Sequence, residues 1–339
     1  MNRVFIVAEL SANHGGKIDI AIDTIKAAAK AGADAIKLQT YKPQTMTVDI
    51  DKDDFIIKGG TIWDGENLFK LYQKAFTPWD WHEKLFKVAA ENNLTCFSTP
   101  FDKTSVDFLE KLNNPIYKIA SFEITDIPLI KYIASLGKPI IMSTGIANHE
   151  DIKLAVDTCK SNGCKDLTVL KCTSSYPAPI DEANLLMMSK IGKDFDVKIG
   201  LSDHTMGTTV PIVATTLGAT VIEKHIILDK SIGGPDAKFS LDISEFKEMV
   251  NAVRDAENSM GRISYELTEK QKTGRQFSRS LYAVSNISKG EIFSEQNVRS
   301  IRPGFGLHPK YYENIIGKKS PVDLNCGDRL TTSILNDIQ

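Results

Sequence analysis

The most constraining feature of this sequence is an alternation of short apolar runs with longer amphipathic stretches, repeated eight times. The apolar runs are rich in β-branched residues and have the length of strands that are buried on both faces. The expected strands are Val4–Leu10, Ala35–Thr40, Thr95–Pro100, Ile116–Ser121, Pro139–Thr144, Leu167–Thr173, Val197–Asp203 and Val221–Ile227. The expected helices include Asp19–Ala31, Trp79–Asn92, Ser105–Leu112, Asp151–Ser161 and Ser244–Met260. Eight strand–helix units in succession predict an α/β fold, the (β/α)8 or TIM barrel.

A doubly wound open sheet is the alternative architecture for such an alternation. That fold usually carries a glycine-rich fingerprint directly after its first strand. Here the first strand is followed by Gly15 and Gly16 alone, which do not make that fingerprint. The barrel is therefore the favoured prediction.

The pattern changes after residue 261, which we take as the end of the barrel domain, 1–261. Residues 262–276 are polar and charged and are expected to be a linker. Short strand-like runs follow at Ser280–Val284, Glu291–Phe293 and Val298–Ile301, separated by turn signals. Residues 277–339 should form a second domain that is too small to support catalysis by itself.

Charge and cysteine content exclude several classes of protein. The net charge is -2 and there is no basic tail, so neither nucleic acid nor an anionic membrane is expected as a partner. The apolar start of the chain is interrupted by Glu9, unlike a signal peptide, and no run is long enough to span a membrane. The five cysteines are odd in number and lack a CxxC pair. A soluble cytoplasmic protein without disulfides is the expectation.

Polar side chains gather at the carboxyl ends of the expected strands, which is where TIM barrels place their reacting groups. So many polar groups at one mouth would be costly to bury unless they were paired or bound to a ligand. They therefore predict an active site. The residues concerned are Glu9, Asn13, His14, Lys37, Gln39, Ser98, Thr99, Lys118, Ser121, Glu123, Ser143, Thr144, Lys171, Thr173, Ser174, Tyr176, Ser202, Asp203, His204, Glu223 and His225.

Three lysines in this set, Lys37, Lys118 and Lys171, indicate an anionic ligand. Each lies in an apolar strand, where an unpaired ammonium group is expensive. A phosphate or carboxylate ligand would neutralise them, and the neighbouring hydroxyl groups would supply further donors to phosphate oxygens. An internal ion pair with Glu9 or Glu223 is the alternative for any one of the lysines.

Five of the six histidines fall into three groups. His204 and His225 end adjacent strands, so their imidazoles could meet at the mouth and bind a divalent ion. A hydrogen-bonded core pair is the alternative. His82 and His149 lie on expected helices and should face solvent, whereas His14 directly follows the first strand.

The order of motifs along the chain resembles that of the sialic acid synthase family. The motifs are ELSANHGG from Glu9, KLQTY from Lys37, STPFD from Ser98, YKIASFEITD from Tyr117, STG from Ser143, KCTSSYPAP from Lys171, GLSDHT from Gly200, EKH from Glu223 and GGPDAKFSL from Gly233. The runs SKGEIFSEQNV and RPGFG resemble that family's antifreeze-like (SAF) domain. The resemblance implies a transferase that condenses phosphoenolpyruvate with an amino sugar to give a nine-carbon 2-keto acid.

Within the family, SANHGG, SFEITDIPLIKYIAS and the GGPDAKFSL loop resemble pseudaminic acid synthases. The implied substrate is 2,4-diacetamido-2,4,6-trideoxy-L-altrose, and the implied product is pseudaminic acid, a sugar of flagellin or surface glycans. N-acetylneuraminate and legionaminate synthases are the alternatives within the family.

The resemblance also implies roles for single residues. His204 and His225 match metal ligands, for Mn²⁺, Mg²⁺ or Co²⁺, and Glu9 matches the acid/base residue beside the metal. Lys37 matches the partner of the phosphoenolpyruvate carboxylate. The expected phosphate contacts are Thr99, Lys118, Ser121, Ser143, Ser202 and Ser174, which stands where neuraminate synthases commonly have Asn. The expected sugar-side residues are Tyr176 and Asp236, with Glu123 also at the substrate site. Arg302 matches an arginine that the SAF domain donates to its partner's site, which implies a domain-swapped homodimer.

Two functions from other classes fit part of this pattern. A metal-dependent aldolase or isomerase acting on a phosphosugar would explain the lysines and histidines, but not the C-terminal domain. A non-enzymatic sugar- or phosphate-binding protein of the periplasm would carry a signal peptide and two similar lobes, which this sequence lacks.

Overall fold

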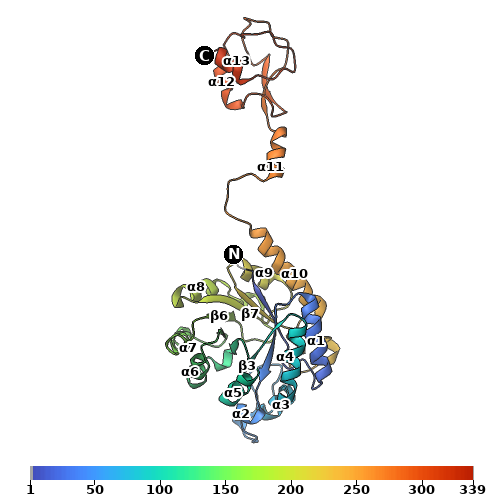
Figure 1. Ribbon diagram of the computed structural model, residues 1–339, viewed down its shortest axis with the longest axis vertical. Helices are drawn as coiled ribbons and strands as arrows, with labels where there is room; N and C mark the ends of the chain where they lie inside the picture. Colours follow the sequence, from blue (N-terminus) through green and yellow to red (C-terminus); the bar gives the residue numbers. More distant parts are fainter. Residues whose placement is uncertain (1–2, 339) are drawn as a thin grey trace. The chain divides into compact units, whose positions relative to one another are not determined.

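Eight parallel strands close into a barrel in the computed structural model, which describes residues 3–338 (Figure 1). Each strand pairs with its neighbours in chain order, and β1 pairs with β8 to close the ring. The strands are β1 (Phe5–Glu9), β2 (Ala35–Thr40), β3 (Thr95–Pro100), β4 (Tyr117–Ile119), β5 (Ile140–Ser143), β6 (Leu167–Cys172), β7 (Lys198–Asp203) and β8 (Val221–His225). The predicted TIM barrel is confirmed, and each strand lies within the range expected from the sequence.

Helices surround the barrel, and some of them begin at a side chain that accepts hydrogen bonds from the first turn. Asp102, Asn148 and Asp242 cap three of them in this way. The helices are α1 (Ile18–Ala31), α4 (His82–Glu91), α5 (Lys103–Lys111), α6 (Ile127–Ser135), α7 (His149–Ser161), α8 (Leu186–Phe195), α9 (Thr209–Thr216) and α10 (Ile243–Met260). Their apolar faces pack on the outside of the strands and form two large apolar clusters with them.

The connection from β2 to α4 is long and contains structure of its own. It holds α2 (Pro43–Met46), α3 (Leu68–Ala75) and two short 3₁₀ turns, Asp53–Phe55 and Trp79–Trp81. The helix expected to begin at Trp79 therefore begins at His82, after the second of these turns.

Strand alternation divides the barrel interior into an apolar floor and a polar mouth. Val7, Ala35, Phe97, Leu170 and Val221 are among the residues of one buried apolar cluster. Two residues further along β1, β2 and β8 come Glu9, Lys37 and Glu223, which share the same face of their strands because side chains alternate with period 2. The register places Glu9 opposite both Lys37 and His225.

His82 corrects one expectation, because it is buried and not solvent-facing. Its Nε2 lies 2.8 Å from Thr40 Oγ1, and its Nδ1 lies 3.2 Å from the carbonyl oxygen of Pro78. The apolar side of α4 and the outward-facing hydroxyl of β2 enclose the ring, which the sequence pattern could not show. His149 is exposed, as expected.

The chain forms two compact units, Met1–Gly261 and Arg262–Gln339. The second contains α11 (Glu269–Gly274), β9 (Ser280–Ala283), β10 (Val298–Ile301), α12 (Tyr312–Ile315) and α13 (Thr332–Asp337), with β9 and β10 antiparallel. Its core includes Leu281, Phe293 and Leu330. The strand expected at Glu291–Phe293 is wrong, since Ile292 makes an isolated bridge with Lys319 there. No helix within residues 3–338 is long and apolar enough to cross a membrane.

Burial of His82 predicts that stability depends on pH. Burial lowers its pKa from 6.5 to about 4. Between these values the unfolded chain binds a proton that the folded chain excludes, so stability is present above pH 6.5 and is lost as the pH falls toward 4. The contribution is about 3 kcal/mol. We expect His82→Gln to flatten the dependence of the unfolding free energy on pH in this window.

Urea titrations at several pH values measure that slope. The matched control is His149→Gln, whose imidazole is exposed in the folded protein and should leave the slope unchanged. An unaltered slope in His82→Gln would show that His82 is not the titrating group. Burial also lowers the pKa of His14 to about 4, so part of the slope should persist in the variant.

Candidate active site

Two lysines and two glutamates form a buried charged cluster at the polar mouth of the barrel. Lys37 makes an ion pair with Glu9, and its Nζ lies 3.6 Å from Glu223 Oε2. Lys118 Nζ lies 3.6 Å from Glu223 Oε1. All four side chains are at least 94% buried. We call Glu9, Lys37, Lys118 and Glu223 the charged cluster.

Desolvation and mutual attraction oppose each other in the charged cluster. Burial raises the pKa of Glu9 to about 7, against the attraction of Lys37. Burial also disfavours ionised Glu223, but Lys118 and Lys37 together hold its pKa below the ordinary value. Burial lowers the pKa of Lys118. A cluster with this much desolvated charge adds little net stability, so its composition points to a ligand.

Hydroxyl groups surround the charged cluster. Lys118 Nζ donates to Ser143 Oγ at 2.7 Å, and Lys37 Nζ donates to Thr99 Oγ1 at 3.2 Å. Ser202 Oγ donates to Glu223 Oε1 at 2.9 Å. Hydroxyls can turn their hydrogens toward a bound anion, so this shell provides donors in addition to the two ammonium groups.

Ser121 and Ser174 form a second pair of hydroxyls beside Gly145. Ser174 Oγ donates to Ser121 Oγ at 3.0 Å, and Ser121 Oγ accepts from the backbone N–H of Ile146 at 3.1 Å. A β-carbon on Gly145 would lie 2.0 Å from Ser174 Oγ and 2.7 Å from Ser121 Oγ. Position 145 therefore requires glycine if both hydroxyls are to approach each other.

Lys171 does not join the charged cluster, contrary to the expectation of three lysines around one anion. It alternates on β6 with Leu170 and Cys172, so it points to the other face of that strand. Its Nζ donates to the carbonyl oxygen of Cys172 at 2.8 Å. The expectation failed because the strand boundary alone did not fix which residues of β6 point inward.

His204 and His225 lie beside the charged cluster with their ring centroids 5.3 Å apart. His225 Nδ1 is buried and has no hydrogen-bond partner within residues 3–338, and Asp236 Oδ2 lies 4.0 Å away from it. Burial and the neighbouring His204 hold the pKa of His225 well below its ordinary value, so the ring is neutral. His204 Nδ1 lies 3.1 Å from the carbonyl oxygen of Thr173, which orients that ring.

These two imidazoles fit a divalent ion with open coordination positions. A neutral imidazole with an orphaned buried nitrogen is a metal ligand in its required protonation state, and an oriented second ring is the usual arrangement at such sites. No group of three or more His, Cys, Asp or Glu within the described residues could hold a metal. Any ion at this position would complete its coordination with water or substrate.

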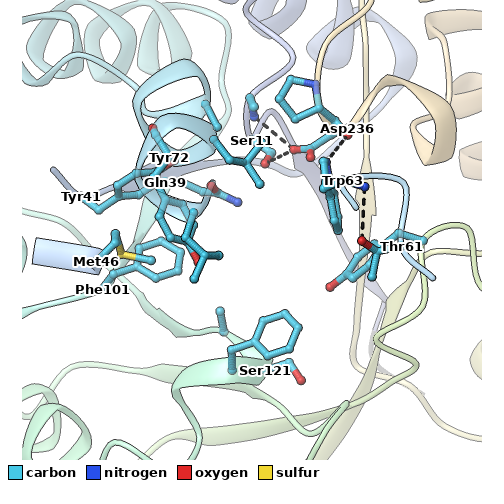
Figure 2. A pocket seen from close by; sticks show the side chains of 18 of the residues that line it. Ser11, Gln39, Tyr41, Met46, Thr61, Trp63, Tyr72, Phe101, Ser121 and Asp236 are labelled. Atoms are coloured by element: carbon cyan, nitrogen blue, oxygen red, sulfur yellow. Dashed lines mark hydrogen bonds between the residues drawn. The ribbon is translucent and has the colours of Figure 1, made fainter. Parts of the chain in front are cut away.

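A cavity of about 420 Å³ is lined by His225, Asp236, Ser121, Glu123 and Tyr176 among other residues (Figure 2). Three further lining residues make polar contacts, and Ser11 and Trp63 are not among the residues expected from the sequence. Ser11 donates to Asp236, Gln39 Nε2 donates to Glu9 Oε1 at 3.4 Å, and Trp63 Nε1 donates to the carbonyl oxygen of Pro235 at 3.1 Å. Trp63 lies in no motif that carries a catalytic signal in the sequence.

Glu123 has an exceptional position in this cavity. Its Oε2 is buried without a hydrogen-bond partner among residues 3–338, and burial raises its pKa to about 7. It can therefore present either a carboxylate or a carboxylic acid to a ligand near neutral pH. The other expected site residues belong to the barrel unit, whereas Arg302 belongs to the second unit.

The chain and its fold are similar to those of known proteins. The model of the NeuB family matches residues 24–265, and that of the SAF domain matches residues 278–335. A pseudaminic acid synthase from Campylobacter jejuni is 51% identical, with 98% of this chain and 96% of the relative covered. An N,N'-diacetyllegionaminic acid synthase from the same species is 39% identical, with 94% and 96% covered. The crystal structure of the spore coat polysaccharide biosynthesis protein SpsE from Bacillus subtilis is similar with a TM-score of 0.66 at 33% identity, covering 98% and 95%.

The charged cluster predicts a specific response to added anion. We expect Glu223→Gln to destabilise the protein by about 3 kcal/mol, because two buried ammonium groups lose a shared counterion. Inorganic phosphate should raise the thermal midpoint of this variant by more than that of the wild type, since the anion replaces the missing charge.

Thermal unfolding with and without phosphate measures both effects. Asp157→Asn is the matched control, because it removes one negative charge from an exposed ion pair with Lys153. That variant should lose less than about 1 kcal/mol and respond to phosphate like the wild type. Equal phosphate responses in Glu223→Gln and the wild type would contradict an anion site at the charged cluster.

Proposed function

The chain belongs to the NeuB family, and we propose that it is a pseudaminic acid synthase. In the reaction, phosphoenolpyruvate condenses with 2,4-diacetamido-2,4,6-trideoxy-L-altrose to give pseudaminic acid and phosphate. The observation that carries the proposal is 51% identity over nearly the whole length of a pseudaminic acid synthase, against 39% to a legionaminic acid synthase. The alternatives inside the family are a legionaminate or an N-acetylneuraminate synthase.

Phosphoenolpyruvate binds at the charged cluster in this proposal. It carries a phosphate and a carboxylate, which together match two buried ammonium groups. Lys118 with Ser143 receives the phosphate, and Thr99, Ser121, Ser174 and Ser202 add donors around it. Lys37 binds the carboxylate. The 2.7 Å hydrogen bond between Lys118 and Ser143 supports this assignment, because it holds the two donors at one position.

A divalent ion, Mn²⁺, Mg²⁺ or Co²⁺, would be held by His204 and His225. When bound, it would act as a Lewis acid that polarises the aldehyde of the open-chain sugar. The neutral state of His225 and the orientation of His204 support these two residues as ligands. Asp236 lies close enough to orient water or sugar at the same position.

Bond formation and phosphate release use separate groups. Carbon 3 of phosphoenolpyruvate attacks the aldehyde carbon, and carbon 2 thereby becomes cationic. Water then adds to carbon 2. Glu9 takes a proton from this water, and its pKa of about 7 suits a base that works near neutral pH. The carbon–oxygen bond to phosphate then breaks, and Lys118 with its hydroxyl neighbours stabilises the leaving phosphate.

Tyr176, Asp236 and Glu123 bind the amino sugar. All three line the cavity beside the histidine pair. The ring of Tyr176 lies 4.6 Å from that of His204, which puts a sugar-binding side chain next to the site of carbonyl activation. A cytoplasmic location also belongs to the proposal, and the free thiols of all five cysteines support it.

Arg302 completes the sugar site of a second subunit in a domain-swapped homodimer. Residues 1–261 form the catalytic barrel, 262–276 the linker and 277–339 the SAF domain that donates the arginine. Mixing two inactive variants, Glu9→Gln and Arg302→Ala, tests this arrangement. Each mixed dimer should contain one intact site, and random exchange should restore about a quarter of wild-type activity. No recovery after verified subunit exchange would contradict donation between subunits.

Phosphate release from phosphoenolpyruvate in the presence of Mn²⁺ tests the function directly. Three sugars are compared: the diacetamido trideoxy altrose, the corresponding mannose, and N-acetylmannosamine. We expect release with the first sugar alone, together with a nine-carbon keto acid in the mass spectrum. Release only with another sugar would reassign the substrate within the family. Failure with all three would favour the metal-dependent aldolase.

A further inference from the structure

One side of the cavity is apolar although both proposed reactants carry many polar groups. Met46, Ile57, Leu68, Leu71 and Phe101 line it. We call these five residues the apolar wall. Each is half-buried, and none belongs to the apolar clusters formed by residues 3–338. Their side chains therefore line the cavity and do not pack into an apolar core.

In helix α3, apolar side chains face the cavity along the whole length of the helix. Leu68, Leu71, Tyr72 and Ala75 all line the cavity. Their spacing of three and four residues makes one continuous stripe on a helix. The buried residue of this helix, Phe69, lies on a different face. Helix α3 thus directs its apolar stripe at the cavity.

Two residues of the apolar wall lie across the cavity from a residue of the proposed sugar site. Figure 2 shows Met46 and Phe101 together on one side of the cavity, with Asp236 and Trp63 across from them. His225 and Asp236 line the same cavity. A ligand that fills the cavity would therefore contact polar groups at His225 and Asp236 and apolar side chains of the wall.

Phosphoenolpyruvate cannot be the ligand at this wall, because its charged groups are matched by Lys37 and Lys118 in the charged cluster. An unmodified polyhydroxy sugar would lose hydration against the wall without gaining hydrogen bonds. Methyl groups on a sugar would gain from burial there, at about fourfold in affinity for each methyl.

We propose that the apolar wall binds the methyl groups of the acceptor sugar and thereby selects N-acetylated, 6-deoxygenated acceptors over more hydroxylated ones. This inference rests on the proposed function, since it concerns the second substrate of that reaction. It identifies the residues of the apolar wall as specificity-determining: Met46, Ile57, Leu68 and Leu71 come from the β2–α4 connection, and Phe101 directly follows β3.

The test pairs a substitution in the wall with removal of a methyl group from the sugar. The acceptors are the preferred sugar and its N-formyl analogues, which lack one acetyl methyl each. For the wild type we expect at least one N-formyl analogue to show a KM about fourfold higher than the parent. In Leu71→Asn the KM for the parent should rise about tenfold and the difference between parent and analogue should disappear. The KM for phosphoenolpyruvate should stay within about twofold.

Two controls separate specificity from folding. Leu71→Met keeps an apolar side chain of similar size and should therefore keep the preference for acetyl over formyl that Leu71→Asn loses. Leu136→Asn makes the same polar change at a half-buried leucine between α6 and β5, outside the cavity lining. It should not alter the preference for acetyl over formyl. Thermal unfolding of each variant shows whether it is folded.

The measurements are made on whichever sugar the wild type uses best, so the two proposals can fail separately. A preferred acceptor other than the diacetamido altrose overturns the proposed function. The KM values measured with that acceptor and its N-formyl analogues still test the role of the apolar wall. Equal wild-type KM values for acetyl and formyl sugars overturn the wall. The role of the wall is also overturned if folded Leu71→Asn keeps the preference for acetyl over formyl sugars. The same holds if its KM for phosphoenolpyruvate rises as much as its KM for the acceptor.

Discussion

The ion pair of Lys37 with Glu9, extended through Glu223 to Lys118, is the interaction around which the mouth of the barrel is organised. Such desolvated charges are tolerated only in a rigid frame that supplies their partners. The parallel register provides that frame, since it sets Glu9 between Lys37 on β2 and His225 on β8. Closure of the sheet therefore brings together charges that are distant in the sequence, and the apolar floor below them keeps out water.

The same frame separates three tasks within one cavity. The charged cluster suits an anion, the imidazoles of His204 and His225 suit a divalent ion, and the apolar wall, which comes mainly from the β2–α4 connection, lines the same cavity as His225. The strands hold the groups that must keep a fixed geometry. The connection holds the groups that would distinguish one acceptor from another. Substrate preference can therefore change by substitution in α2 and α3 without disturbing the charged cluster.

The barrel was predictable because buried parallel strands are apolar and rich in β-branched residues, a pattern that is visible in the sequence alone. Candidate residues at the strand ends followed from the same periodicity. Three features depended on contacts that periodicity does not specify. Lys171 points to the other face of β6, His82 is enclosed between Thr40 and Pro78, and the stripe of α3 faces a cavity. In each case the residue type and the secondary structure were compatible with either side of an element, and only packing decided between them.

A crystal structure of the protein with phosphoenolpyruvate and Mn²⁺, recorded near the manganese absorption edge, tests the central claim most directly. The account predicts an anomalous peak between the imidazoles of His204 and His225. It also predicts the phosphate within hydrogen-bonding distance of Lys118 Nζ and Ser143 Oγ, and the carboxylate beside Lys37. Manganese bound elsewhere, or phosphoenolpyruvate outside the pair of lysines, would contradict it.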